Sequence, residues 1–180
     1  MTLASLLLNI GFVGPMNIGI AELADHRGWG SSGIGLMLAG VGLGAAVGGL
    51  LTMKWRIRRN AGVWIAVLCM IEGGCLFAVA VAPGIALAVT ATSVIGLTLG
   101  PVNVLSTVLE QREVPDEFRG RVASIQLVIS LGLIPMTYGV TGLIIAVIGT
   151  TGAFTLGGLL EVSVVLTLFA PAYRRARVED

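Results

Sequence analysis

The sequence predicts an all-α polytopic membrane protein, built as a single bundle of six transmembrane helices. Hydrophobic residues make up 56% of the 180 residues and charged residues only 12%, whereas soluble domains carry roughly 25% charge. Six apolar stretches are each long enough to cross a hydrocarbon core of about 30 Å at about 1.5 Å per residue. The basic residues gather in clusters between or after these stretches, which indicates that the clusters lie on one side of a membrane.

The predicted spans are runs of apolar residues bounded by charged or turn-forming residues. The second is the clearest, because no charged residue interrupts 34–53 and Lys54 follows at once. Pro15 removes a backbone donor from the first span and should kink it there. Pro135 and the neighbouring glycines should bend the fifth span and pack it closely against other helices. The single domain 1–180 thus contains spans at about 2–24, 34–53, 63–81, 85–109, 122–148 and 153–170.

Glycines recur every four residues along the second span, at Gly40, Gly44 and Gly48. This spacing places them along one side of a helix, where small residues let helix backbones approach closely in lipid. A nucleotide-binding loop is the alternative for glycines at this density, and it fails because no strand precedes them. We therefore predict that this side of the helix packs against another helix.

The distribution of charge orients the predicted bundle. Lys and Arg near the ends of spans favour the cytoplasmic side. Because the number of spans is even and the basic clusters share one side, we expect both termini in the cytoplasm of a multi-pass protein of the cell membrane. No basic or acidic tail indicates a nucleic-acid partner. The predicted cytoplasmic loop residues are Lys54, Arg56, Arg58, Arg59, Arg119 and Arg121.

The sequence does not indicate an enzyme. It contains no HExxH or GxSxG motif and only one histidine, so we expect neither catalysis nor a cofactor nor a bound metal. Cys69 and Cys75 are six residues apart in an apolar run. This spacing puts them on different faces of a helix and suits neither a disulfide nor a zinc site. A channel would need a filter-like motif or a ring of charge, and neither is present.

Glu72 and Glu161 lie near the middle of the third and sixth spans. A charge at this depth costs about 2.5 to 3.5 kcal/mol on insertion scales. No Lys or Arg lies at a similar depth to pair with either acid, so we expect one or both to be protonated or to be solvated by a cavity. Since acids inside a membrane are often functional, both are candidates for proton coupling.

Three stretches carry a resemblance to a known family. They are GFVGPMNIGIAELA at 11–24, GLMLAGVGLGAAVGGLLTMKWRIRR at 35–59 and VPDEFRGRVAS at 114–124. With them the sequence resembles the carboxy-terminal six-helix half of a major facilitator superfamily transporter, in the drug-efflux branch that includes enterobactin exporters and macrolide efflux proteins. Family members often carry an acidic residue and a glycine before the basic pair that follows the second span. Here Met53 and Arg56 stand near those places, so this loop motif is degenerate.

The resemblance implies a secondary active transporter, an antiporter that exports small amphipathic molecules. The family usually has two related six-helix halves, so the implied partners are membrane lipid, a small-molecule substrate, and a second half or a second copy of the chain. The family also places the third and sixth spans at the outer flank, away from the pathway, which argues against coupling by the two acids. The alternative is a truncated remnant or a membrane scaffold that does not transport. An adjacent reading frame encoding six amino-terminal helices would separate the two.

In the family, the first and fourth spans of each half line the central cavity. Polar side chains at membrane depth also tend to face a cavity or another helix, and hydrogen bonding between helices is the alternative use. The resulting substrate-binding candidates are Asn9, Asn17, Asn103 and Thr107.

Overall fold

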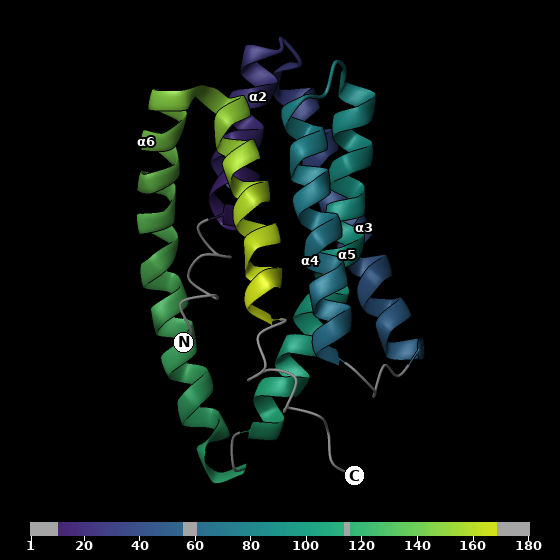
Figure 1. Ribbon diagram of the computed structural model, residues 1–180, viewed down its shortest axis with the longest axis vertical. Coiled ribbons are helices and arrows are strands. Elements are labelled where there is room, and N and C mark those ends of the chain that lie inside the picture. The colour runs from purple at the N-terminus through teal and green to yellow at the C-terminus, as the bar shows by residue number, and fades with distance from the viewer. Residues whose placement is uncertain (1–10, 56–60, 114–115, 169–180) are drawn as a thin grey trace.

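The computed structural model describes residues 11–55, 61–113 and 116–168, and every regular element within these ranges is a helix (Figure 1). The prediction of an all-helical membrane protein is confirmed to this extent. Four helices are long and apolar enough to cross a membrane, and their apolar windows are Gly30–Lys54, Val63–Ala80, Ile85–Val108 and Leu131–Ser163.

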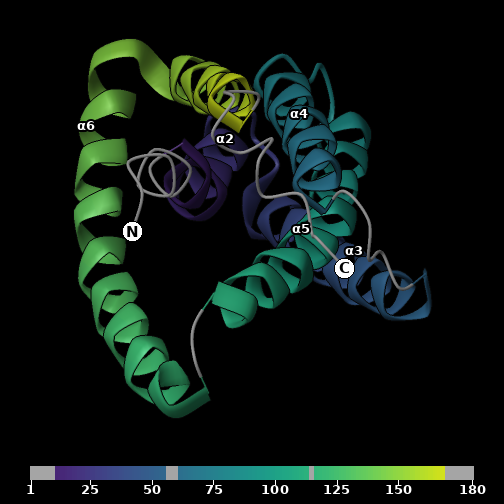
Figure 2. The ribbon, with the colours of Figure 1, turned by 60° about the horizontal axis from the view of Figure 1, so that its bottom comes forward.

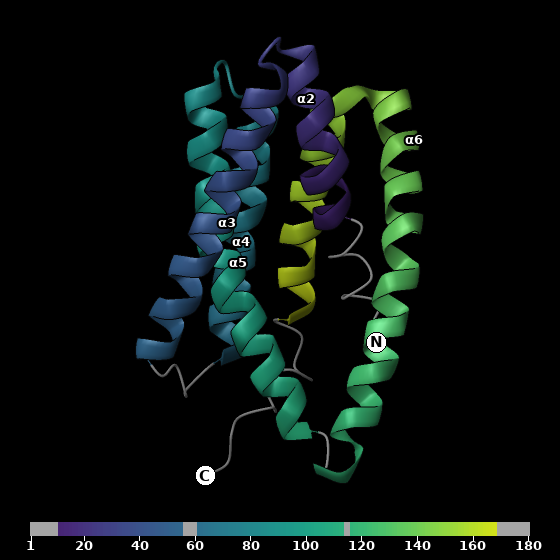
Figure 3. The ribbon, with the colours of Figure 1, turned by 180° about the vertical axis from the view of Figure 1, so that it is seen from behind.

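Three of the long helices lie side by side as one group (Figures 1 and 3). They are α3 (Gly30–Trp55), α4 (Ala61–Ala80) and α5 (Ile85–Glu113). The helix α3 begins four residues before the apolar run that predicts it, at Gly30, which has a positive φ, as does Gly28 in the turn just before the helix. A helix meets its own backbone hydrogen bonds, so it can continue past the apolar run into the polar region beyond the hydrocarbon.

The N-terminal segment changes its helical pitch at Pro15. Residues 11–14 are helical, η1 (Pro15–Gly19) is a π-helical turn, and α2 (Ile20–His26) follows. The backbone N–H of Ile20 donates to the carbonyl of Pro15, five residues back. Proline has no N–H to donate into the preceding turn, and a π turn is one way in which a helix absorbs such an interruption. The predicted kink at Pro15 thus takes the form of a wider turn.

The last helix, α6 (Arg119–Leu168), follows the short η2 (Asp116–Phe118) and consists of two arms. The break lies at Gly149, whose φ of 74° and ψ of 171° are not helical. We call 119–148 the first arm and 150–168 the second arm. The chain turns back at the break, so the second arm runs opposite to the first (Figure 1). The predicted fifth and sixth spans leave residues 149–152 for the turn between them. In the structure, only Gly149 departs from helical geometry in this turn.

Replacing Gly149 with alanine should destabilise the protein by about 1 to 3 kcal/mol, because a residue with a Cβ rarely adopts a positive φ together with an extended ψ. Gly142→Ala is the matched control. A Cβ at Gly142 would meet nothing within 4 Å, and alanine favours a helix over glycine by about 1 kcal/mol. The measurement is the free energy of unfolding in detergent. Equal effects of the two substitutions would contradict the assignment of the reversal to Gly149.

The glycine side of α3 packs against α5, as predicted. A Cβ at Gly44 would lie 2.7 Å from the backbone N of Leu97, and one at Gly48 would lie 2.8 Å from Cδ of Pro101. The contact is reciprocal, since a Cβ at Gly100 would lie 2.6 Å from the backbone N of Gly49. The two backbones therefore touch, and only residues without side chains allow this approach.

The core lies where the N-terminal segment and the second arm meet the group of α3, α4 and α5. Its largest side chains come from every one of these parts. They include Ile20, Met37, Leu76, Ile95 and Phe154. The first arm stands at the edge of the bundle, and the N-terminal segment and the second arm lie between it and α3–α5 (Figures 2 and 3).

Close packing around the glycines of the fifth span is not found among the described residues. A Cβ at Gly132, Gly139 or Gly142 would meet nothing within 4 Å there. The reason is the position of the first arm at the edge of the bundle, where these glycines face away from the other described helices. Only 11% of the apolar window of α6 is buried.

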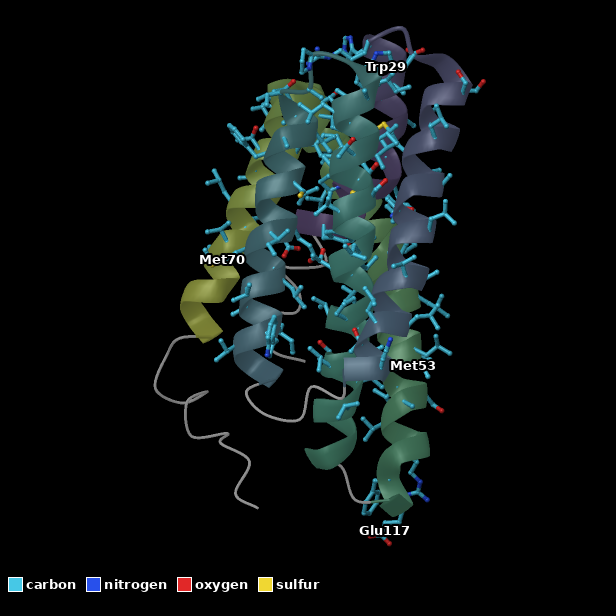
Figure 4. All side chains as sticks on the ribbon, turned by 90° about the vertical axis from the view of Figure 1, so that its right-hand side faces the viewer. Trp29, Met53, Met70 and Glu117 are labelled. Atoms are coloured by element: carbon cyan, nitrogen blue, oxygen red, sulfur yellow. The ribbon has the colours of Figure 1, made fainter. Side chains whose placement is uncertain are left out.

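The outer surface is apolar between two polar ends. Met53 on α3 and Met70 on α4 are exposed, as are most of the large apolar side chains on the outward sides of these helices. Trp29 and Glu117 lie at opposite ends of the molecule (Figure 4). This arrangement suits a chain whose sides face lipid and whose ends face water.

Candidate functional site: a buried carboxylate pair

Two carboxylates meet inside the bundle. Glu72 lies on α4 and Glu161 on the second arm of α6, and only 3% and 2% of their surfaces are exposed. The Sγ of Cys69 lies beside them, so that this sulfur and one oxygen of each carboxylate are all within 4.8 Å of one another. We call these three residues the Cys-Glu cluster.

A glycine contact brings the two acids together. Gly73 follows Glu72 directly, and Gly158 precedes Glu161 by about one helical turn. A Cβ at Gly73 would lie 2.8 Å from the carbonyl oxygen of Gly158, and one at Gly158 would lie 2.6 Å from that of Gly73. The backbones of α4 and the second arm therefore touch beside the acids. This approach places the carboxylates against each other rather than against lipid.

The opposite side of the second arm packs on the N-terminal segment at Gly157, the residue before Gly158. A Cβ at Gly157 would collide with the carbonyl oxygen of Gly11 and lie 3.3 Å from Cγ of Pro15. Because Pro15 has no N–H, that carbonyl lacks its usual partner four residues on. Two successive glycines thus let one helix approach two neighbours, and the position of Glu161 is fixed from both sides.

Thr98 on α5 supplies the third wall of the site. Its hydroxyl donates to Oε1 of Glu72 at 3.0 Å, and it also lies 2.8 Å from the carbonyl oxygen of Ile95. One hydroxyl hydrogen cannot serve both acceptors at full strength. A protonated Glu72 removes this competition, since it donates to the threonine while the threonine donates to Ile95. The hydroxyl therefore accommodates either protonation state of the acid.

Glu161 has no comparable partner. Its Oε2 is buried and makes no hydrogen bond with the described part of the chain. In the same ranges, no Lys, Arg or His forms an ion pair with either carboxylate. A buried carboxyl group without a partner is costly. The site is therefore suited to take up a proton or another cation.

Among the described residues, the predicted substrate residues line no common pocket. Asn17 in η1 and both Asn103 and Thr107 on α5 are exposed. The side-chain amide of Asn17 donates to the backbone carbonyl of Val13 at 2.8 Å. The hydroxyl of Thr107 donates to the backbone carbonyl of Asn103, also at 2.8 Å. The fourth candidate, Asn9, lies outside the described residues.

The predicted cytoplasmic residues that the structure describes lie at or near the ends of helices. Lys54 is exposed in the last turn of α3, Arg119 begins α6, and Arg121 is exposed two residues further on. The remaining members of that prediction, Arg56, Arg58 and Arg59, lie outside the described residues.

Sequence reasoning missed two members of this neighbourhood, Cys69 and Thr98. The cysteine lies three residues before Glu72, a spacing that puts both on one helical face, so this signal was available. Nothing in the sequence marks Thr98, because its distance from Glu72 depends on how α5 packs on α4. Cys75, which shares the apolar run with Cys69, is only partly buried and lies outside the cluster.

A small cavity lies on the other side of the second arm. It has a volume of about 10 Å³ and is lined in part by Gly11, Pro15, Thr141 and Gly157. This is about the space that one water molecule needs, and the buried hydroxyl of Thr141 has no hydrogen-bond partner among the described residues. The cavity is too small to hold an organic substrate.

The fold and the site define an all-helical membrane protein with a buried carboxylate pair between its helices. No family model, curated protein or solved structure matches the chain. The resemblance to major facilitator transporters therefore rests on the three sequence stretches alone.

Proposed function

We propose that the chain is one half of a secondary active transporter of the major facilitator type, an antiporter that exports small amphipathic molecules across the cell membrane. In such transporters the substrate site lies near the middle of the membrane, between two repeated helical units that move against each other. The chain supplies one unit, with both termini in the cytoplasm. A separate half or a second copy supplies the other.

The described elements are compatible with six crossings. The helices α3, α4 and α5 account for three of the four long apolar windows, and the fourth, Leu131–Ser163, contains the reversal at Gly149. Because the arms run in opposite directions, we assign two crossings to α6. The helical segment 11–26 belongs to the remaining crossing, which is the first in chain order.

An open small-residue face supports the need for a second unit. The glycines of α3 have α5 as their partner, whereas Gly132, Gly139 and Gly142 on the first arm meet no neighbour among the described residues. In lipid, faces of small residues are where helices associate. This face of the first arm is therefore suited to contact with a helix outside the described part of the chain, which in this proposal belongs to the second unit.

The observation that carries the proposal is the exposure of polar side chains on apolar helices. Asn17, Asn103 and Thr107 are all exposed, although large apolar residues dominate the exposed surface around them. In the described part of the chain, no side chain hydrogen-bonds to the amide of Asn103. Polar groups at membrane depth are expected to face a cavity or another helix rather than lipid. Their exposure therefore supports a pathway that forms only when a second unit covers them.

Substituting Thr107 with valine should slow transport by about fivefold, as expected when one hydrogen bond of roughly 1 kcal/mol to the substrate is lost. Thr90→Val is a matched control. Both threonines are exposed on α5, and each donates to the carbonyl four residues earlier at 2.8 Å. The measurement is ATP-independent accumulation of ethidium by inside-out vesicles from the source cells, in which any natural partner is present.

Two results would contradict the proposal. One is ethidium accumulation that is unchanged when the gene for the chain is deleted, together with unchanged accumulation of a wider set of amphipathic dyes. The other is an equal effect of the two threonine substitutions at equal protein levels, which would show that Thr107 acts only on the stability of α5.

A further inference from the structure

The Cys-Glu cluster is built from three separate helical positions whose polar atoms already converge. Cys69 and Glu72 are three residues apart on one face of α4, and Glu161 reaches them from the second arm of α6. Glycine contacts beside the acids fix the approach of these two helices. The ligand atoms therefore need only small rotations of side chains to surround a common point.

The unpartnered oxygen of Glu161 indicates that a group is to be bound there. Oε2 of this residue is buried without a hydrogen bond from the described residues, in a side chain that is 98% buried. Glu72 differs, because Thr98 donates to its Oε1 at 3.0 Å. Carboxylates that ligate metals are themselves held by such outer hydrogen bonds. The cluster thus contains one carboxylate held by a hydrogen bond (Glu72), one carboxylate with an unpartnered oxygen (Glu161) and one thiol (Cys69).

We propose that Cys69, Glu72 and Glu161 form a binding site for a divalent metal ion of borderline softness, such as Zn²⁺. Thiolate sulfur favours Zn²⁺ and its heavier congener Cd²⁺, whereas Mg²⁺ and Ca²⁺ prefer sites made only of oxygen. Three protein ligands with one open position are also the usual arrangement of a zinc site that exchanges its fourth ligand. Thr98 is a positioning residue that orients the carboxylate of Glu72.

Charge balance favours the exchange of an ion for protons. A cluster that is neutral costs least inside a low-dielectric bundle. A divalent ion that displaces the thiol proton of Cys69 and the proton of one carboxyl group preserves this neutrality, because the other carboxyl group keeps its proton and coordinates through its carbonyl oxygen. The site lies within one chain, so ion binding does not depend on transport or on a second unit.

The proposal is tested by adding Cd²⁺ to the purified full chain in detergent. We expect one Cd²⁺ per chain by equilibrium dialysis, with an ultraviolet band from sulfur-to-cadmium charge transfer. Zn²⁺ should displace the ion and abolish the band, and Mg²⁺ at the same concentration should not. Cys69→Ala should remove the band, whereas Cys75→Ala, which deletes the other thiol, should leave both the band and the stoichiometry unchanged.

Two further variants separate binding from folding. Thr98→Val should weaken Cd²⁺ affinity by about 10- to 100-fold, the usual effect of losing an outer hydrogen bond to a ligand. Glu161→Gln keeps the shape of the side chain and removes its charge, so it should weaken binding further while the protein stays folded by circular dichroism and gel filtration. An absent band in the folded wild type would overturn the proposal. A band equally strong in Cys69→Ala, or full affinity in folded Glu161→Gln, would also overturn it.

Discussion

Gly44→Leu is expected to disrupt the pairing of α3 and α5 and to lower the free energy of unfolding by more than about 3 kcal/mol, the upper end of the usual range for overpacking. A Cβ at this position would collide with the carbonyl oxygen of Ser93 and lie 2.7 Å from the backbone N of Leu97. Both are backbone atoms, so no side chain can rotate away. The helices must separate to accept the new side chain.

Gly42→Leu is the matched control, because it makes the same chemical change on the same helix. Gly42 is exposed, and a Cβ there would meet nothing within 4 Å. Leucine is also a better helix former than glycine, so stability should stay level or rise slightly. The measurement is the unfolding midpoint of each variant in one detergent. Similar losses from the two substitutions would remove the α3–α5 contact as the cause.

Two groups of glycines, one on α3 and one on the first arm, show what a small-residue pattern can and cannot predict. The four-residue spacing of Gly40, Gly44 and Gly48 identifies a packing face, because the helical period alone puts the three in line. The presence of Gly132, Gly139 and Gly142 in the fifth span led to a similar expectation, and no such packing is found among the described residues. A small-residue pattern shows that a face can be approached closely. It does not show whether the neighbour belongs to the same chain.

The candidate site shows the same limit. The depth and isolation of Glu72 and Glu161 could be predicted separately, since each is an acid in an apolar run without a basic residue nearby. Their contact could not, because it depends on how α4 meets the second arm at Gly73 and Gly158, and nothing local in the sequence pairs these glycines. The sequence therefore indicates only part of the proposed metal site, the pair Cys69 and Glu72 on one helical face, and does not indicate that Glu161 joins them.

The second large expected effect is the dependence of transport on the number of chains in each lipid vesicle. A single chain in a lipid vesicle should not transport ethidium, and activity should return when each vesicle holds a second six-helix unit. Among the described residues, the glycines of the first arm have no neighbour, and Asn17, Asn103 and Thr107 are exposed. In the proposed transporter, one unit presents one wall of a pathway whose opposite wall belongs to another unit.

The measurement is reconstitution at lipid-to-protein ratios that pass from several chains per vesicle to fewer than one. If two copies form the transporter, the active fraction of vesicles should fall with the square of the mean occupancy. If a separate half is required, activity should stay at background at every ratio until that half is added. Activity that falls in direct proportion to occupancy, without any partner, would mean that one chain suffices. Exposed polar groups favour association, because burying them against a second unit relieves their contact with lipid. Covalent linkage of two copies should therefore restore transport at the lowest occupancy if the transporter is a homodimer.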